Sequence, residues 1–279
     1  MRFSFVVFIL ALTVSAYYPV ILLHGFTAGG STMTLLAETI ERLHPGQKAF
    51  PLYVHDFNQS FVGLWDQIYD VHDKILETIA KDPELFKDGY HLLGMSMGNL
   101  LLRAVLEMWP MNVVNYVSLA GALNGLYMCH DPVVCEAETE LLYKPETQKI
   151  LSVANMWKTP QDQHERYLDN NIFIPFFDNE RNFNASLKEN FLRIKKLYLF
   201  GSDGDEVISP WDASLFNFLQ TFNVSLPMEK QGIYANDTFG LQTLDKEGRM
   251  IRTPVPGLKH CDWTDIPEVQ EKYVMDALP

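Results

Sequence analysis

A serine between two glycines, in Gly94-Met-Ser96-Met-Gly98, has a pattern that indicates chemistry. The apolar segment 91–93 before it is typical of a strand, and the segment 100–108 after it is typical of a helix. A serine on such a sharp strand-to-helix turn is presented as a nucleophile, and the glycines are needed because side chains there would collide with neighbouring backbone. The alternative is a glycine-rich turn with an incidental serine. The flanking strand and helix favour the nucleophile.

A serine hydroxyl is a weak nucleophile until a histidine accepts its proton and a carboxylate orients that histidine. On folds with this turn, the carboxylate follows the serine in the chain and the histidine comes last. A predicted strand ending at Phe200 leads into an acidic loop, where we predict Asp205 as the carboxylate and Asp203 as the alternative. A solvated turn would also explain both residues, because Asp and Gly favour turns. Of the eight histidines, only His260 follows this loop.

Acyl transfer through a serine also needs donors for the oxyanion that forms at the carbonyl. In this kind of site the backbone N–H groups come from the residue after the nucleophile, here Met97, and from the loop after an early strand, here at Phe26. His24 at the end of that strand precedes the nucleophile, so we predict a structural role for it. The sequence has no Cys-x-x-Cys or His-x-x-x-His spacing. We therefore expect neither a metal nor an organic cofactor.

The order of predicted elements places these residues on one fold. Strand-like and helix-like segments alternate, which predicts a mostly parallel sheet with helices on both faces, and with the serine turn an α/β-hydrolase fold. The alternation stops between residues 122 and 190, so we predict one domain at 17–279 with a cap-like insertion. Strands are predicted at 18–23, 52–54, 91–93, 113–119 and 193–200, and helices at 33–43, 65–79, 100–108, 211–218 and 267–275.

Charge and the N-terminus limit the partners and the compartment. With 22 Lys and Arg against 35 Asp and Glu, the net charge of −13 disfavours nucleic acid and anionic membranes. Residues 1–16 have the layout of a secretory signal peptide, with Arg2 before an apolar run and a small-residue ending at Ala16. A buried strand or a membrane anchor is the alternative. The run is shorter than the ~20 residues of a spanning helix, so no stable membrane insertion is expected.

Glycosylation sequons and cysteines agree with the secretory pathway. Cys129 and Cys135 are close enough in sequence to close a small disulfide loop, as expected in an oxidising lumen, which leaves Cys261 unpaired. Four Asn-x-Ser/Thr sequons occur, at Asn58, Asn184, Asn223 and Asn236.

With these residues in view, the chain resembles the palmitoyl-protein thioesterase family, and most of all its lysosomal branch. The resemblance covers nearly all of residues 17–279. It implies Ser96, Asp205 and His260 as the triad, hydrolysis of long-chain acyl thioesters, and a lysosomal or also secreted location reached through a receptor for N-glycans. It also supports the disulfide. The family commonly has Gln where this chain has Met97, which should not matter for a backbone donor. The matching segments are 19–25, 44–46, 94–98, 188–193, 207–211, 239–244 and 257–260.

The acyl chain is expected to lie on apolar side chains of the insertion and of the acidic loop. We predict Phe173, Phe176 and Trp211 as contacts, because burial contributes about 0.8 kcal/mol per methylene and selects long chains without polar recognition. The alternative is that these aromatics form the core of the insertion. Two further functions stay open: an oxygen-ester lipase or carboxylesterase on the same fold, and an inactive hydrolase-fold binding module. The inactive module requires a lost triad residue, and none is lost.

Overall fold

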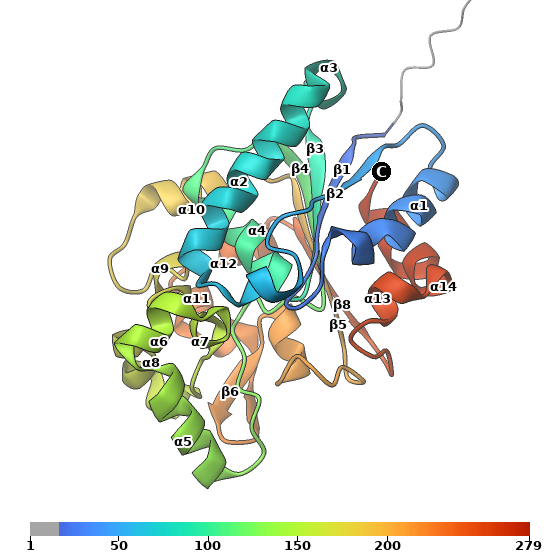
Figure 1. Ribbon diagram of the computed structural model, residues 1–279. Coiled ribbons are helices and arrows are strands. Elements are labelled where there is room, and N and C mark those ends of the chain that lie inside the picture. Colours follow the sequence, from blue (N-terminus) through green and yellow to red (C-terminus); the bar gives the residue numbers. More distant parts are fainter. Residues whose placement is uncertain (1–16) are drawn as a thin grey trace, which may run out of the picture.

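Six parallel strands form one sheet at the centre of the molecule (Figure 1). The computed structural model describes residues 17–279, so the predicted signal peptide lies outside the described residues. The spatial order β2-β1-β3-β4-β5-β8 reverses direction at β1, as expected of a doubly wound α/β fold. The strands are β1 (Val20–Leu23), β2 (Ala49–Pro51), β3 (Tyr90–Met95), β4 (Val113–Leu119), β5 (Lys196–Ser202) and β8 (Met250–Val255).

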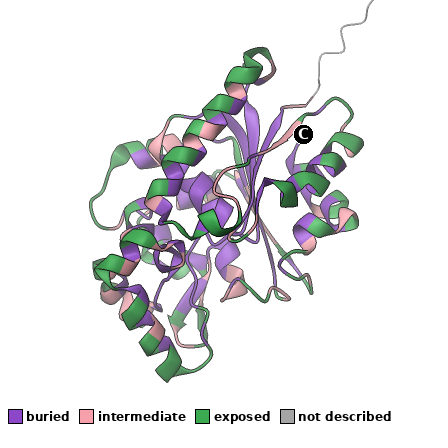
Figure 2. Cartoon of the chain, viewed as in Figure 1, coloured by how far each residue is buried: buried purple, intermediate pink, exposed green. Residues whose placement is uncertain are grey.

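Helices cover both faces of the sheet, which confirms the predicted α/β class. In Figure 1, α1, α13 and α14 lie on one side, and α2, α4 and α10 on the other. Strands β1, β3 and β4 are buried along their whole length, as parallel strands between two helical layers must be (Figure 2). These helices are α1 (Thr34–Leu43), α2 (Leu64–Lys81), α4 (Met97–Met108), α10 (Ala185–Phe191), α13 (Asp262–Asp265) and α14 (Pro267–Val269), with α3 (Pro83–Phe86) after α2.

Between β4 and β5, the segment predicted as an insertion folds into short helices below the sheet (Figure 1). The predicted disulfide between Cys129 and Cys135 is present and joins the start of this segment to its first helix. These helices are α5 (Pro132–Leu142), α6 (Pro145–Ile150), α7 (Ser152–Met156), α8 (His164–Asn170) and α9 (Ile174–Phe177), followed by α10.

Two sequence predictions of secondary structure were wrong, and one strand was missed. The strand expected at 52–54 is β2, three residues earlier. The helix expected at 211–218 is a 3₁₀ turn, Trp211–Leu215, that ends at Phe216 with a φ of 62°, and the chain continues as an antiparallel hairpin of β6 (Phe218–Thr221) and β7 (Val224–Leu226). The edge strand β8 was not predicted. After the hairpin come the short helices α11 (Gly232–Ala235) and α12 (Leu241–Lys246).

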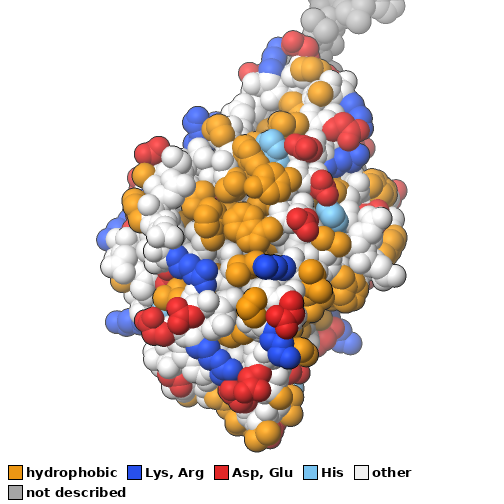
Figure 3. All heavy atoms as spheres, turned by 60° about the vertical axis from the view of Figure 1, so that its left-hand side comes forward, with side chains coloured by type: hydrophobic (Ala, Val, Ile, Leu, Met, Phe, Trp, Pro, Cys, Tyr) orange, Lys and Arg blue, Asp and Glu red, His pale blue; other side chains and the backbone are white. Residues whose placement is uncertain are grey.

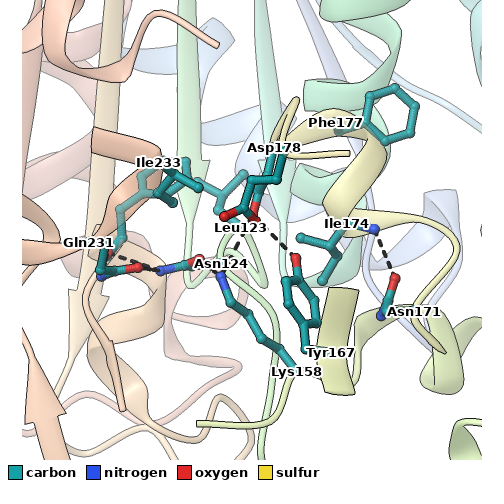
Figure 4. A network of polar contacts seen from close by, with 12 residues as sticks. Leu123, Asn124, Lys158, Tyr167, Asn171, Ile174, Phe177, Asp178, Gln231 and Ile233 are labelled. Atoms are coloured by element: carbon teal, nitrogen blue, oxygen red, sulfur yellow. Dashed lines mark hydrogen bonds and ion pairs between the residues drawn. The ribbon is translucent and has the colours of Figure 1, made fainter. Parts of the chain in front are cut away.

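A buried cluster of charged side chains joins the insertion to α4. Arg103 on α4 forms ion pairs with Glu107 and with Asp178, each at 2.8 Å, and all three side chains are fully buried. Lys158 lies 3.6 Å from Asp178 and donates to Asn124, and the Tyr167 hydroxyl donates to Asp178 (Figure 4). These contacts fix the insertion against the sheet. Among residues 17–279, no helix is both long and apolar enough to cross a membrane.

Candidate active site

Ser96 lies between the last residue of β3 and the first residue of α4 in a strained backbone conformation. Its φ of 54° and ψ of −127° are unfavourable for a residue with a side chain. The neighbouring glycines explain how the turn fits. A Cβ at Gly94 would lie 2.3 Å from Asn99 Oδ1, and a Cβ at Gly98 would lie 2.3 Å from the His24 carbonyl oxygen. The turn therefore requires glycine at both positions, and it holds the serine at the carboxyl edge of the sheet.

The loop after β1 approaches the serine closely enough to serve an oxyanion. A Cβ at Gly25 would lie 2.7 Å from Ser96 Cβ, so the chain at this point passes directly beside the serine. Among the described residues, the backbone N–H groups of Phe26 and Met97 have no acceptor. The next residue, Thr27, is held by a 2.9 Å hydrogen bond from its N–H to Ser60 Oγ. Two unpaired donors thus lie on the two segments that flank the serine.

His24 holds this loop in place. Its ring nitrogens lie 2.9 Å from the Gly25 carbonyl oxygen, and 3.0 Å from both the Val54 carbonyl oxygen and Asp56 Oδ1. The side chain is buried and its partners belong to the loops after β1 and β2. These contacts agree with the structural role predicted for His24. The contributions of Asp56 and Ser60 could not be predicted from local patterns, because each acts through a contact some 30 residues away.

Asp205 and His260 meet at the same edge of the sheet. Asp205 follows β5, His260 follows β8, and His260 Nδ1 lies 2.8 Å from Asp205 Oδ2. The other carboxylate oxygen, Oδ1, accepts hydrogen bonds from the backbone N–H groups of Val207 and Ile208. The backbone N–H of His260 donates to Glu206 Oε2 at 3.1 Å. The acidic loop therefore fixes the position of the histidine through both its side chain and its backbone.

Asp203, the alternative carboxylate, has a different contact. Its Oδ1 accepts a hydrogen bond from the Gly257 N–H at 2.7 Å, and it does not contact the His260 ring. Asp203 thus joins the two loops and leaves the imidazole to Asp205. Ser96 and His260 are both nearly buried, and between them the structure has no hydrogen bond. Such contacts are commonly long without substrate and tighten when it binds.

A pocket of about 580 Å³ opens beside the acidic loop. Trp211, predicted to contact an acyl chain, is part of its wall together with Met128, Val207 and Ile208. Asp205 also lines it, so the pocket adjoins the contact between Asp205 and His260.

The other two predicted acyl contacts lie elsewhere. Phe173 is fully buried and packs against Trp65 and Phe177. Phe176 packs against Trp65 with part of its surface exposed. Neither lines the pocket beside Asp205, and their contact with substrate stays a prediction.

Two further features of the chain bear on the site. The four sequon asparagines are all exposed on the surface. Cys261 is unpaired, and burial together with surrounding carboxylates raises the pKa of its thiol, which keeps this neighbour of His260 protonated and weakly nucleophilic. Among the described residues, no group of three or more His, Cys, Asp or Glu side chains could hold a metal ion.

Comparison with known proteins identifies the family. The family model described as palmitoyl protein thioesterase matches residues 19–260. The chain belongs to this family. A Xenopus laevis relative named lysosomal thioesterase PPT2-B is 33% identical over 269 residues, which cover 93% of this chain and 92% of the relative. The human lysosomal thioesterase PPT2 is 33% identical over 259 residues, covering 89% of this chain and 84% of the human protein.

Solved structures share the fold of this thioesterase family member. A monoacylglycerol lipase from Paleococcus ferrophilus superposes with a TM-score of 0.52 at 15% identity, covering 93% of this chain and 92% of the lipase. An extracellular α/β-hydrolase from a Paenibacillus species has a TM-score of 0.51 at 13% identity, with 94% and 99% of the two chains covered. At such identity the likeness concerns the fold alone. The predicted α/β-hydrolase fold is thus confirmed.

Proposed function

We propose that this protein is a lysosomal thioesterase that hydrolyses long-chain fatty acyl thioesters, with Ser96 as nucleophile, His260 as general base and Asp205 as its orienting carboxylate. The observation that carries the proposal is the 2.8 Å contact between Asp205 and His260 at the sheet edge where Ser96 occupies its strained turn. Membership of the thioesterase family and the names of the lysosomal relatives support the substrate class and the location.

The reaction follows from the positions of these groups. Ser96 Oγ attacks the thioester carbonyl carbon while His260 accepts the hydroxyl proton, and the N–H groups of Phe26 and Met97 stabilise the tetrahedral oxyanion. When the carbon–sulfur bond breaks, His260 returns the proton to the departing sulfur. Water then attacks the acyl-enzyme with His260 again as base, which releases the fatty acid and restores the serine. A thiol with a pKa near ~8.5 leaves with less proton assistance than an alkoxide does.

For the acyl chain, we propose the pocket at Trp211 as part of the binding surface. Its wall combines apolar side chains with Asp205, so a chain held there would end near the acid–base pair. The exposed sequons support delivery to the lysosome through N-glycans and a receptor that reads them, and release by secretion is a further proposal.

The decisive experiment is labelling with a fluorophosphonate probe, together with turnover of palmitoyl-CoA, in wild type and Ser96→Ala. We expect Ser96→Ala to lose labelling and to lower kcat by at least about 10⁴-fold. Because the strained serine is not a core residue, the variant should stay folded. Equal labelling of the two proteins would refute the assignment. Faster turnover of a long-chain nitrophenyl ester than of palmitoyl-CoA would favour an oxygen-ester hydrolase, and wild type without labelling would favour an inactive binding module.

A further inference from the structure

Helix α5 presents an apolar stripe to solvent on the side opposite its buried face. Val133, Val134 and Leu141 are 78%, 49% and 55% exposed, and Ala137 is exposed as well. At about 100° per residue, these four side chains fall within an arc of about 100°. The opposite side of the helix is already buried through Cys135, Thr139 and Leu142. Single exposed apolar residues are common, but a continuous stripe indicates a contact surface.

The segment that leads into α5 lines the pocket of the candidate active site. The disulfide ties the segment at Cys129 to the first turn of α5, and the preceding residue, Met128, is 40% exposed and lines the pocket with Asp205. The backbone N–H of Tyr127 donates to the Ser209 carbonyl oxygen at 2.7 Å, which joins this segment to the acidic loop. In Figure 1, α5 forms the lower tip of the molecule, and apolar side chains are exposed at the lower tip in Figure 3. A surface bound to α5 would thus lie next to the pocket.

We propose that α5, with Met128, docks on the surface of a zwitterionic lipid aggregate, so that acyl thioesters pass from the lipid into the pocket. This inference rests on the proposed function, because long-chain acyl thioesters are amphiphiles that reside in membranes and micelles. A helix that buries only a few apolar side chains in lipid lies shallowly at the lipid–water boundary, and α5 fits this description. A stable protein dimer would instead need about 1,200–2,000 Å² of buried surface, far more than four small side chains provide.

The charges beside the stripe select the type of lipid. The segment from Met128 to Tyr143 contains no Lys or Arg. Glu138 and Glu140 border the stripe, whereas Glu136 is paired with Arg166 at 2.7 Å. Free carboxylates at the edge of the stripe are attracted to the quaternary ammonium of choline headgroups and repelled by anionic lipids. The expected surface is therefore phosphatidylcholine, without acidic lipid.

Vesicle flotation measures this docking directly. We expect the full-length glycoprotein, carrying Ser96→Ala to prevent turnover, to bind phosphatidylcholine vesicles at pH 7, and adding Val133→Glu and Leu141→Glu to lower the partition coefficient by about tenfold or more. The matched control is Leu76→Glu on α2, a leucine of similar exposure (45%) outside the pocket, and it should bind as the parent does. Thermal unfolding checks that each variant is folded. Equal binding by the double variant and the parent overturns the proposal.

Further measurements separate this inference from the proposed function. In the serine-containing enzyme, Val133→Glu with Leu141→Glu should leave kcat/KM on a soluble butyryl thioester within about twofold, and should slow hydrolysis of a palmitoyl thioester embedded in vesicles by about tenfold. A wild type that binds vesicles but cleaves no thioester refutes the proposed function and leaves the docking site. Tighter binding when phosphatidylserine is added refutes the zwitterionic surface. A dimer in sedimentation that the double variant dissociates assigns the stripe to a second copy and overturns the lipid proposal.

Discussion

In two parts of the molecule a carboxylate contacts a basic side chain at the same distance, 2.8 Å. These pairs are Asp205 with His260 and Asp178 with Arg103. The first pair lies in loops at the carboxyl edge of the sheet, and its carboxylate lines a pocket. The second lies between α4 and the insertion with no exposed surface, and the guanidinium is covered by the Phe239 ring at 3.9 Å. Distance alone therefore does not distinguish a catalytic pair from a structural one. Access for substrate and a nearby nucleophile do.

The Asp205–His260 pair and the buried cluster also differ in which contacts a carboxylate keeps when its basic partner is removed. At the sheet edge, Asp205 keeps two backbone donors without the histidine, so its charge stays solvated by the protein. In the buried cluster, Glu107 depends on Arg103 and has one oxygen without a hydrogen-bond partner, whereas Asp178 would keep only the Tyr167 hydroxyl and Lys158 at 3.6 Å. Burial raises the pKa of Glu107 to about 8, with the charge of Arg103 acting against this rise. We expect the Asp205–His260 pair to govern rate and the buried cluster to govern stability.

The largest expected effect comes from replacing the carboxylate that contacts the histidine. Asp205→Asn should lower kcat on palmitoyl-CoA by about 10⁴-fold, because an amide no longer holds the imidazole in its working tautomer. Asp203→Asn, the matched control at the residue directly after β5 in the same loop, should lose less than about tenfold, since Asp203 contacts only the Gly257 N–H. Steady-state kinetics on both folded variants provides the measurement. Equal losses would make the two loop carboxylates equivalent and remove the distinction drawn from geometry.

A second substitution tests the buried cluster. Arg103→Met should lower the free energy of unfolding by about 3–5 kcal/mol, because it removes the guanidinium that contacts buried Glu107 and Asp178 at 2.8 Å and leaves Asp178 with Lys158 alone at 3.6 Å. The kcat/KM of the protein that remains folded should stay within a few-fold of wild type. Urea unfolding followed by tryptophan fluorescence, with activity measured on the same samples, gives both quantities. A large fall in kcat/KM without a loss of stability would place Arg103 in the catalytic machinery instead.

Glu107→Gln replaces a carboxyl group of the buried cluster by an amide of similar shape. The folded pKa of Glu107, about 8, lies above the value of 4.5 for an unperturbed glutamate, so the folded protein retains a proton that the unfolded chain releases between these values. The stability contributed by this proton is present below about pH 4.5 and is lost as the pH rises through about 8. Gln cannot lose a proton, so the variant should unfold with a weaker pH dependence in this range. A pH dependence unchanged from wild type would contradict the protonated state.

Much of the fold and of the candidate site could be predicted from the sequence, because local patterns determine them. The Gly-x-Ser-x-Gly turn at Ser96, the acidic loop at Asp205 and the late His260 are each short segments, and their order along the chain matches the order of β3, β5 and β8 across the sheet. Strand β8 was missed because its sequence, Met-Ile-Arg-Thr-Pro-Val, has polar residues and a proline, which only an edge strand tolerates.

The buried cluster could not be predicted from the sequence for a different reason. Arg103 and Glu107 have helical spacing on α4, but Asp178 lies 75 residues after Arg103 and Lys158 lies within the insertion. No local pattern indicates that such distant charges pair in the interior. The exposed apolar stripe of α5 could not be predicted either. Which side of this helix is buried, through Cys135 and Thr139, depends on how the insertion folds.

His91 is a buried base without a carboxylate partner, and its replacement has the smallest expected effect. It lies near the start of β3, away from the serine end of that strand, and its ring is fully buried against Tyr18. Nε2 lies 3.2 Å from the Pro279 carbonyl oxygen, and Nδ1 has no hydrogen-bond partner. Burial lowers the pKa of His91 to about 4, helped by the nearby His44 and opposed by the hydrogen bond to Pro279. This histidine stays neutral above that pKa, and it lies outside the site in which we propose that His260 exchanges a proton with Ser96.

The consequence is a loss of stability in acid. Because the folded pKa, about 4, lies below the ordinary value of 6.5, the unfolded chain binds more protons between these values, and stability falls as the pH drops through this window. The full loss would be about 3 kcal/mol. At pH 7.5 we expect His91→Leu to be less stable than wild type, because the substitution removes the hydrogen bond to Pro279. At pH 5 this difference in stability should close or reverse. Urea unfolding at pH 5, 6 and 7.5 measures it, and His130→Leu controls for loss of an exposed histidine. A constant gap between His91→Leu and wild type at all three pH values would show that His91 takes up its proton in the folded protein as readily as in the unfolded chain.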